Sequence, residues 1–353
     1  MIQESGWRRY RARVVSAMAV IVSAAMCNMT SADQAARQTI GQIERLDPAL
    51  DVLVPADAKL EVLVDGRDWS EGPVWIPEDG GFVLWSDIPP NEIHRWDARA
   101  GHSLYLKPSG YTGNEPRGGE PGSNGLALGR DGRLLLCQHG DRRIARMDAP
   151  LTDPQPHYVT IADRYDGQRF NSPNDLTIHS SGAIYFTDPP YGLVGNIDDP
   201  AKEIPFQGVY RVTPDGTVTL LTQELERPNG IALSPDERTL YVANSHGPRP
   251  IWMAFPVLVD GTLGDGRVFF DAAELAARRR GMPDGMKVDA HGNLWATGPG
   301  GVLVLSPEGK HLGTLLTGQA TANCAFGEDG STLFITADMY LLRIRLTTKG
   351  LGF

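Results

Sequence analysis

Short apolar runs that begin at a polar residue and end at a polar turn recur along this chain. Residues 229–245 show the form: Asn229, an apolar run over 230–233, a turn over 234–238 and a second apolar run over 239–243. Short apolar runs bounded by turn residues favour buried strands, and two of them joined by a turn favour a β-hairpin. The pattern predicts a hairpin whose first strand starts at a buried amide.

The same pattern occurs six times. The units begin at Glu71, Asn124, Asn174, Asn229, Asp284 and Asn323, so neighbouring units start 39 to 55 residues apart. This period is typical of one four-stranded propeller blade. The segments between them, such as residues 91–98 and 208–221, alternate apolar and polar positions as half-exposed outer strands do. We predict an all-β fold, a six-bladed β-propeller with four-stranded antiparallel blades around a central channel; the alternative is a two-sheet β protein.

The N-terminus departs from this pattern. Basic residues at 6–13 are followed by an apolar stretch at 14–26 and by small residues at 30–32. This arrangement is typical of a secretory signal peptide. We predict a cleaved signal peptide over 1–32, a leader over 33–59 and the propeller domain over 60–353, in a periplasmic or secreted protein. An uncleaved membrane anchor and a lipoprotein attached through Cys27 are the alternatives.

Composition narrows the possible chemistry. The 353 residues carry a net charge of −10, which argues against nucleic acid as a partner. The chain has no CxxC, HExxH, GxSxG or Walker motif, which removes several common chemistries. Cys137 and Cys324 fall in different units, and we expect both to be buried free thiols.

The six unit-starting residues form the main candidate site. Innermost strands of a propeller line its channel, so equivalent positions of the units should lie at one height around the axis. Two carboxylates, Glu71 and Asp284, and four Asn amides would then give a ring of oxygens, which suits a hard cation. We predict one divalent cation, with Ca²⁺ favoured and Mg²⁺, Mn²⁺ or Zn²⁺ possible. The alternative is that these side chains bond their own backbone in Asx-turns.

Other polar residues are candidates for the rim of the channel. His139 and Asp188 lie where second strands of the hairpins end, and Arg169 lies just before the third unit. Each has a structural alternative: Asp188 as a turn cap, His139 as a packed side chain and Arg169 as a solvated surface cation. The Gly- and Pro-rich residues 107–123 predict a loop that could cover the channel mouth.

Several segments also resemble a known family. Residues 71–75 (EGPVW), 171–176 (NSPNDL), 227–245 and 283–298 are similar to signature segments of the SMP-30/gluconolactonase (regucalcin-like) family, and residues 122–143 resemble its bacterial gluconolactonase branch. The resemblance covers roughly residues 60 to 345. It implies a six-bladed propeller with a divalent cation in the channel.

The resemblance also implies roles for individual residues. Glu71, Asn229 and Asp284 correspond to metal ligands, and Asp284 also to the general base. Asn174 corresponds to a residue that contacts metal or substrate, and Arg169 is the nearest counterpart of a family arginine. The repeat adds Asn124, and the rim adds His139 and Asp188, as substrate-binding candidates.

These inferences lead to one functional hypothesis. The chain is expected to hydrolyse a sugar lactone, glucono-1,5-lactone or a related aldonolactone, to the aldonic acid. The cation would polarise the carbonyl and Asp284 would activate water; a nucleophilic Asp284 is the second mechanism. The partner is then a small-molecule lactone, with no nucleic acid and no membrane after signal removal. Alternatives are a hydrolase of non-sugar lactones or organophosphates, and a non-enzymatic Ca²⁺-binding propeller.

Overall fold

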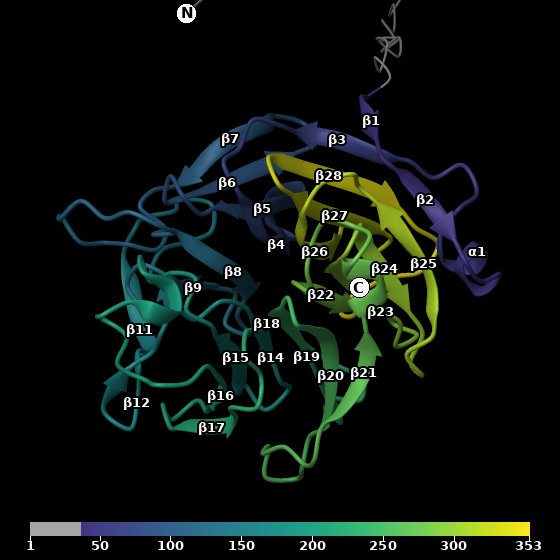
Figure 1. Ribbon diagram of the computed structural model, residues 1–353. Coiled ribbons are helices and arrows are strands. Elements are labelled where there is room, and N and C mark those ends of the chain that lie inside the picture. Colours follow the sequence, from purple (N-terminus) through teal and green to yellow (C-terminus); the bar gives the residue numbers. More distant parts are fainter. Residues whose placement is uncertain (1–36) are drawn as a thin grey trace, which may run out of the picture. The chain divides into compact units, whose positions relative to one another are not determined.

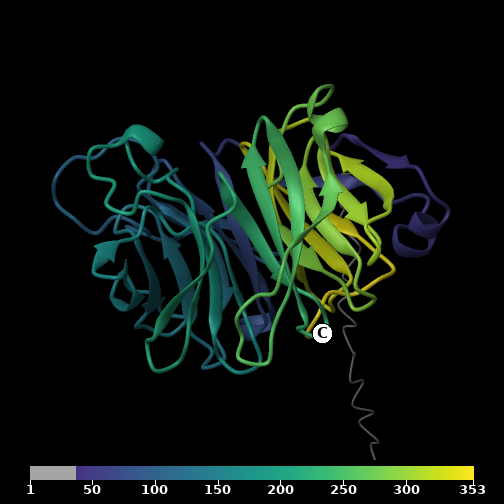
Figure 2. The ribbon, with the colours of Figure 1, turned by 60° about the horizontal axis from the view of Figure 1, so that its bottom comes forward.

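The computed structural model describes residues 37–353, and most of its strands belong to six antiparallel sheets arranged in a ring (Figure 1). The predicted six-bladed β-propeller is confirmed. Viewed after a turn of the molecule, the sheets stand side by side around the axis (Figure 2). The signal peptide predicted for residues 1–32 and Cys27 lie outside the described residues. Within 37–353, no helix is both long and apolar enough to cross a membrane.

Four blades are built from four consecutive strands each. Their bounds are β4 (Ser70–Ile76), β5 (Phe82–Asp87), β6 (Glu92–Asp97) and β7 (Gly101–Leu106); β8 (Ser123–Leu128), β9 (Leu134–Gln138), β10 (Arg143–Met147) and β11 (Tyr158–Ala162); β14 (Leu176–Ile178), β15 (Ile184–Asp188), β16 (Gly208–Val212) and β17 (Val218–Thr222); β18 (Pro228–Leu233), β19 (Thr239–His246), β20 (Arg249–Pro256) and β21 (Arg267–Asp271). The first strand of each blade faces the centre of the ring (Figure 1).

The last two blades recruit strands from the N-terminal part of the described chain. The fifth blade contains β22 (Met286–Val288), β23 (Leu294–Gly298), β24 (Gly301–Leu305), β25 (His311–Leu316) and β2 (Gln42–Arg45); the sixth contains β26 (Thr321–Gly327), β27 (Thr332–Ala337), β28 (Tyr340–Arg345), β3 (Leu60–Val64) and β1 (Thr39–Ile40). The purple β3 lies beside the yellow β28 in Figure 1, with Leu341 opposite Val64. This pairing closes the ring.

The predicted leader therefore contributes directly to the propeller sheets. β1 and β2 extend two blades as fifth strands, and Leu50 of the short helix α1 (Ala49–Leu53) is fully buried against the last two blades. The remaining elements are α2 (Ala273–Ala276), the 3₁₀ turns η1 (Glu78–Gly80) and η2 (Asn196–Asp198), and the hairpin β12 (Arg164–Tyr165) and β13 (Gln168–Arg169), which stands outside the six blades.

The core consists of six apolar clusters, one between each pair of neighbouring blades. Successive residues of a strand point to opposite faces, so β9 sends Leu134 and Leu136 toward the first blade and Leu135 and Cys137 toward the third. Because both faces of a blade are buried, such a strand reads as a continuous apolar run.

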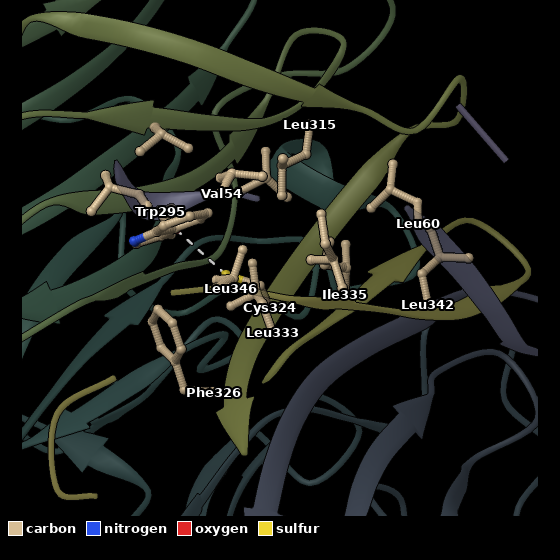
Figure 3. Packing of buried hydrophobic residues seen from close by; sticks show 14 of the residues in the cluster. Val54, Leu60, Trp295, Leu315, Cys324, Phe326, Leu333, Ile335, Leu342 and Leu346 are labelled. Carbon is tan, nitrogen blue, oxygen red and sulfur yellow. Dashed lines mark hydrogen bonds between the residues drawn. The ribbon is translucent and has the colours of Figure 1, made fainter. Parts of the chain in front are cut away.

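Figure 3 shows the interface between the fifth and sixth blades. Trp295, Cys324 and Phe326 pack together there, and the Cys324 thiol donates a hydrogen bond to the Trp295 carbonyl at 3.4 Å. Cys137 and Cys324 are both free and buried, as predicted.

The blade interfaces generate a stability prediction. Leu136→Ala removes a fully buried side chain between the first two blades and is expected to lower the free energy of unfolding by about 2–5 kcal/mol. Leu104→Ala is the matched control, because this leucine of β7 is 54% exposed and its truncation should change stability little. Chemical denaturation measures both, and equal losses would contradict the assignment of the core.

Candidate active site

In four blades, the strand pairing is irregular at or next to the unit-starting residue. The pairing register shifts at Glu71 in β4, next to Asn124 in β8, at Asn229 in β18 and next to Asn323 in β26. A bulge of this kind redirects a side chain and is common beside active sites. In the remaining two blades, Asn174 and Asp284 lie two residues before β14 and β22 begin.

The inner strands approach one another closely just beyond these residues. A Cβ atom on Gly72 would lie 2.0 Å from the Asn124 carbonyl oxygen, and one on Gly230 would lie 2.2 Å from the Asp284 carbonyl oxygen. Only glycine fits such an approach, and at Gly72 the backbone also has a positive φ of 47°. Adjacent blades are therefore in backbone contact at the level of the ring.

Hydroxyl groups link each of three blades to the next at this level. Ser86 Oγ donates to the Asn124 carbonyl at 2.8 Å, Thr187 Oγ1 to the Asn229 carbonyl at 2.6 Å, and Thr297 Oγ1 to the Ala322 carbonyl at 2.8 Å. All three hydroxyl-bearing residues are fully buried. Since their bonds use backbone carbonyls, they fix the inner strands without occupying the amide side chains of Asn124 and Asn229.

The two ring carboxylates influence each other's ionisation. Burial, with the Asp175 and Glu120 carboxylates adding to it, raises the pKa of Glu71 to about 8, although the Gly72 N–H donates to Glu71 Oε2 at 2.9 Å. Burial and the charge of Glu71 raise the pKa of Asp284 well above its ordinary value. Asp284 Oδ1 is buried without a hydrogen-bond partner among the described residues.

A third carboxylate, not predicted from the sequence, lies beside this ring. Asp175 is buried, and burial raises its pKa while the nearby Lys287 ammonium opposes the shift. Its Oδ2 accepts a hydrogen bond from Asn323 Nδ2 at 3.3 Å, so Asn323 is engaged by a protein partner. The sequence did contain a sign of this carboxylate. In four other units the ring residue is followed by a glycine, whereas Asn174 is followed by Asp175; the glycines are Gly72, Gly125, Gly230 and Gly285.

Residues 107–122 form a loop between β7 and β8, as predicted, and this loop lies against the neighbouring rim. Arg117 donates to the carbonyls of Gly140 and Gly192, which follow β9 and β15. Glu120 of this loop is close enough for its charge to act on both Glu71 and Asp284. Repeat analysis could not find Glu120 or Arg117, because the loop has no counterpart in the other units.

His139 is fully buried beneath this loop. Its Nδ1 lies 3.4 Å from Glu120 Oε2, and neither ring nitrogen has a hydrogen-bond partner among the described residues. Its side chain also lies close to Gly192, where a Cβ would come within 2.6 Å of the His139 Cβ. The structure thus joins His139 to this loop through Glu120, whose charge also acts on the ring.

The other two rim candidates have structural contacts. Asp188 accepts the backbone N–H groups of Asn171 and Ser172 at 2.8 Å each and so holds the segment that carries Asn174. Its burial raises its pKa to about 7. Arg169 lies on β13, where its guanidinium donates to the Asp141 carbonyl at 3.2 Å. Within residues 37–353, no hydrogen bond or ion pair joins Arg169 to a ring residue.

Beyond the ring, the lining of the channel changes from polar to mainly apolar. Residues two or more positions past the unit-starting residues, including Leu126, Ile231 and Phe326, line an apolar cavity of about 600 Å³. The C-terminal residues 351–353 also contribute to its lining. The convergent polar groups therefore lie at one end of the channel.

Comparison with known proteins gives this geometry a family. A model of the SMP-30/Gluconolactonase/LRE-like region matches residues 69–338. A gluconolactonase from Zymomonas mobilis is 41% identical over 97% of this chain and 99% of its own length. The chain belongs to the SMP-30/gluconolactonase family.

Two further members of the family extend the comparison. A gluconolactonase of known structure from Xanthomonas campestris is 33% identical, with a TM-score of 0.74 over 88% of this chain and 99% of that one. Pentonolactonase XacC from Haloferax volcanii is 26% identical over 75% of this chain and 80% of its own length. The family assignment made from the sequence is confirmed, and the expected lactonase activity agrees with the names of these relatives.

The residues present fit the divalent cation that membership of this family implies. Glu71 and Asp175 are buried, Asp284 is partly exposed with a buried Oδ1, and the charges of the three carboxylates oppose one another. Within residues 37–353, Asp284 Oδ1 has no hydrogen-bond partner. A divalent cation would neutralise this repulsion, and its oxygen-rich surroundings are those that Ca²⁺ and Mg²⁺ prefer.

These shifted carboxyl groups predict how stability depends on pH and metal. With a folded-state pKa of about 8 against an ordinary 4.5, Glu71 keeps its proton where the unfolded chain has lost it. The free energy of unfolding of chelated protein should therefore fall as pH rises from about 5 to 8. Thermal unfolding with EDTA and with Ca²⁺ at both pH values tests this, and Ca²⁺ should stabilise more at pH 8.

Glu71→Gln provides the control for this dependence. The amide keeps the shape but cannot ionise, so the decrease in melting temperature of chelated protein between pH 5 and 8 should be smaller. An unchanged decrease in this variant, or a chelated wild type that gains stability over the same range, would contradict the assignment.

Proposed function

We propose that the protein hydrolyses a sugar lactone, glucono-1,5-lactone or a related aldonolactone, at the polar end of its channel. The observation that carries the proposal is the convergence of Glu71 and Asp284 beside buried amides, with Asp284 Oδ1 left without a partner among residues 37–353. Full-length similarity to a gluconolactonase supports the substrate class. Removal of residues 1–32 would place the enzyme in the periplasm or outside the cell.

The cation is assigned to the ring carboxylates and amides. Glu71, Asn229 and Asp284, together with Asn174, would hold one divalent ion, for which Ca²⁺ is the first candidate and Mg²⁺, Mn²⁺ or Zn²⁺ the alternatives. When bound, such an ion supplies positive charge that polarises a carbonyl oxygen and stabilises negative charge on it. It would also favour the ionised form of Asp284.

The remaining steps fall to side chains of this chain. An ionised Asp284 can accept a proton at Oδ1 from a water that attacks the lactone carbonyl carbon, since no protein donor occupies that oxygen. The backbone groups of Asn124 and Asn174 already make the hydrogen bonds that link neighbouring strands. Their side-chain amides therefore remain available to bind the sugar hydroxyls. The loop anchored by Arg117 would cover one side of the mouth and restrict its shape.

The direct test follows acid release from glucono-1,5-lactone with a pH indicator, using the full chain after chelation and again with each of the four ions. Spontaneous hydrolysis is subtracted. Metal-dependent turnover supports the proposal, and a panel with a pentonolactone, a non-sugar lactone and a phosphotriester ranks the substrates. A protein that binds the ion and turns over none of the aldonolactones would overturn it in favour of another ester or a binding role.

Asp284→Asn tests the proton acceptor. The amide has nearly the same shape but cannot take up a proton at neutral pH, so kcat should fall by about 10²–10⁴-fold while the melting temperature of chelated protein does not decrease. Turnover at the wild-type rate would remove Asp284 from its role.

Asn229→Ala and Asn124→Ala separate cation binding from substrate binding. Loss of Asn229 should weaken cation affinity by at least about tenfold, measured by calorimetry. Loss of Asn124 should leave cation affinity unchanged and act on KM, because we assign it to the substrate. The opposite result would show that Asn124 binds the cation and Asn229 binds the substrate.

A further inference from the structure

A second group of metal-binding side chains lies in the first blade, away from the ring. Asp87 ends β5, and Glu92 lies directly opposite it at the start of β6, with His94 two residues further on. His94 Nε2 is 3.1 Å from Glu92 Oε2 and 3.9 Å from Asp87 Oδ2. The side chains of Asp87 and His94 are each only 3% exposed. None of the six unit-starting residues takes part.

The spacing of these atoms suits a small metal ion. One ligand atom from each of the three residues lies within 4.8 Å of the other two. Bonds of about 2.0–2.2 Å in a tetrahedral zinc site separate neighbouring ligand atoms by about 3.3–3.6 Å. The two measured separations fall on either side of this value, so small side-chain adjustments would bring all three donors onto one ion.

Neighbouring groups hold two of these side chains in place. His94 Nδ1 lies 3.0 Å from His102 Nε2, so the second ring nitrogen of His94 already has a hydrogen-bond partner. Histidines that bind metals are typically oriented in this way through the nitrogen that faces away from the ion. Asp87 is held by the backbone N–H groups of Asp68 and Trp69, at 3.1 and 2.9 Å from its Oδ1.

The present contacts of His94 Nε2 are in conflict. Arg67 Nη1 approaches it at 3.3 Å and can only donate, so this contact requires a lone pair on Nε2. The Glu92 carboxylate at 3.1 Å accepts, so that contact requires a hydrogen on the same atom. One nitrogen cannot satisfy both. A cation in place of the guanidinium would receive the lone pair of Nε2 and the charge of Glu92 together.

We propose that Asp87, Glu92 and His94 form a second metal site for a divalent ion of the zinc class, with the Arg67 guanidinium as the competing cation. The imidazole favours Zn²⁺, Co²⁺ or Cu²⁺ over Ca²⁺, which distinguishes this site from the oxygen ring of the channel. Asp87 connects the ion to residues 68 and 69, which lead from the ring-closing strand β3 into the first blade.

The test is a Zn²⁺ titration of the full chain by calorimetry, with excess Ca²⁺ present to fill the channel, and metal analysis after dialysis. We expect one Zn²⁺ per chain. Glu92→Gln and His94→Gln should each weaken its binding by at least about tenfold. Asp284→Asn should leave this binding unchanged, because Asp284 belongs to the channel. Zinc that is absent under these conditions, or that binds both variants as tightly as the wild type, would overturn the proposal.

Matched controls exclude adventitious surface binding. Glu78→Gln changes an exposed glutamate of the same blade, and His157→Gln changes an exposed histidine of the second blade. Both should bind Zn²⁺ as the wild type does. A loss of affinity in these controls equal to that in Glu92→Gln and His94→Gln would show surface binding and overturn the site.

Arg67→Gln gives a test that misfolding cannot imitate. Removing the competing guanidinium should tighten Zn²⁺ binding, whereas a damaged fold would only weaken it. Unchanged or weaker binding in a variant whose unfolding transition matches the wild type would count against the site.

Trp85 offers an independent reporter of location. Its ring centroid is 5.5 Å from that of His94 and 5.6 Å from that of His102. Cu²⁺ at the proposed site should quench its fluorescence, and Trp85→Phe should remove the quenched component. Quenching of the same amplitude in Trp85→Phe would place the ion elsewhere.

Discussion

The close approach of the inner strands around the axis is the constraint on which the site depends. Each blade brings its first strand so near to the next that the Asn124 carbonyl occupies the space where Gly72 would carry a Cβ, and the Asp284 carbonyl does the same to Gly230. Backbone contact at this level restricts the conformations that the residues preceding these glycines can adopt. The pairing register also shifts at Glu71 and Asn229, and such bulges redirect side chains. The geometry of the ring is thus a consequence of closing six blades on a narrow channel.

The same closure creates an electrostatic problem that a divalent cation would solve. Glu71, Asp175 and Asp284 come from three blades and are far apart in sequence, yet burial raises the pKa of each, and the charge of Asp175 raises the pKa values of Glu71 and Asp284 further. Lys287 offsets part of the charge near Asp175. Folding of the metal-free chain must therefore leave some of these groups protonated, whereas a divalent ion allows them to be charged. Under the proposed function, metal affinity and the ionisation of Asp284 would be two consequences of one arrangement.

The sequence was sufficient for the fold because each blade is buried on both faces and repeats. The apolar runs, such as that of β9, predicted the six units. The polar residue before each hairpin predicted the candidate ring. Closure of the ring by β3 was not predictable in this way, because its five residues pair with β28, almost 300 positions later in the chain, and belong to no repeat. Glu120 was missed for a related reason, because only tertiary structure brings its irregular loop close enough for the Glu120 charge to act on Glu71 and Asp284. Asp175 could have been found, since it interrupts a pattern of glycines.

Residue type alone did not separate ligands from structural groups, and the structure does so through hydrogen-bond partners. Asp188, which is fully buried, and Asp284, whose Oδ1 is buried in a partly exposed residue, both lie at the polar end of their hairpins. Asp188 accepts two backbone N–H groups from the segment that carries Asn174, so the protein itself satisfies its charge. Asp284 has an oxygen without any partner among the described residues. A buried charge without sufficient partners is costly unless something outside the chain completes it. By this criterion Asp284 is available to a ligand, whereas Asp188 has a structural role and fixes the segment that carries Asn174.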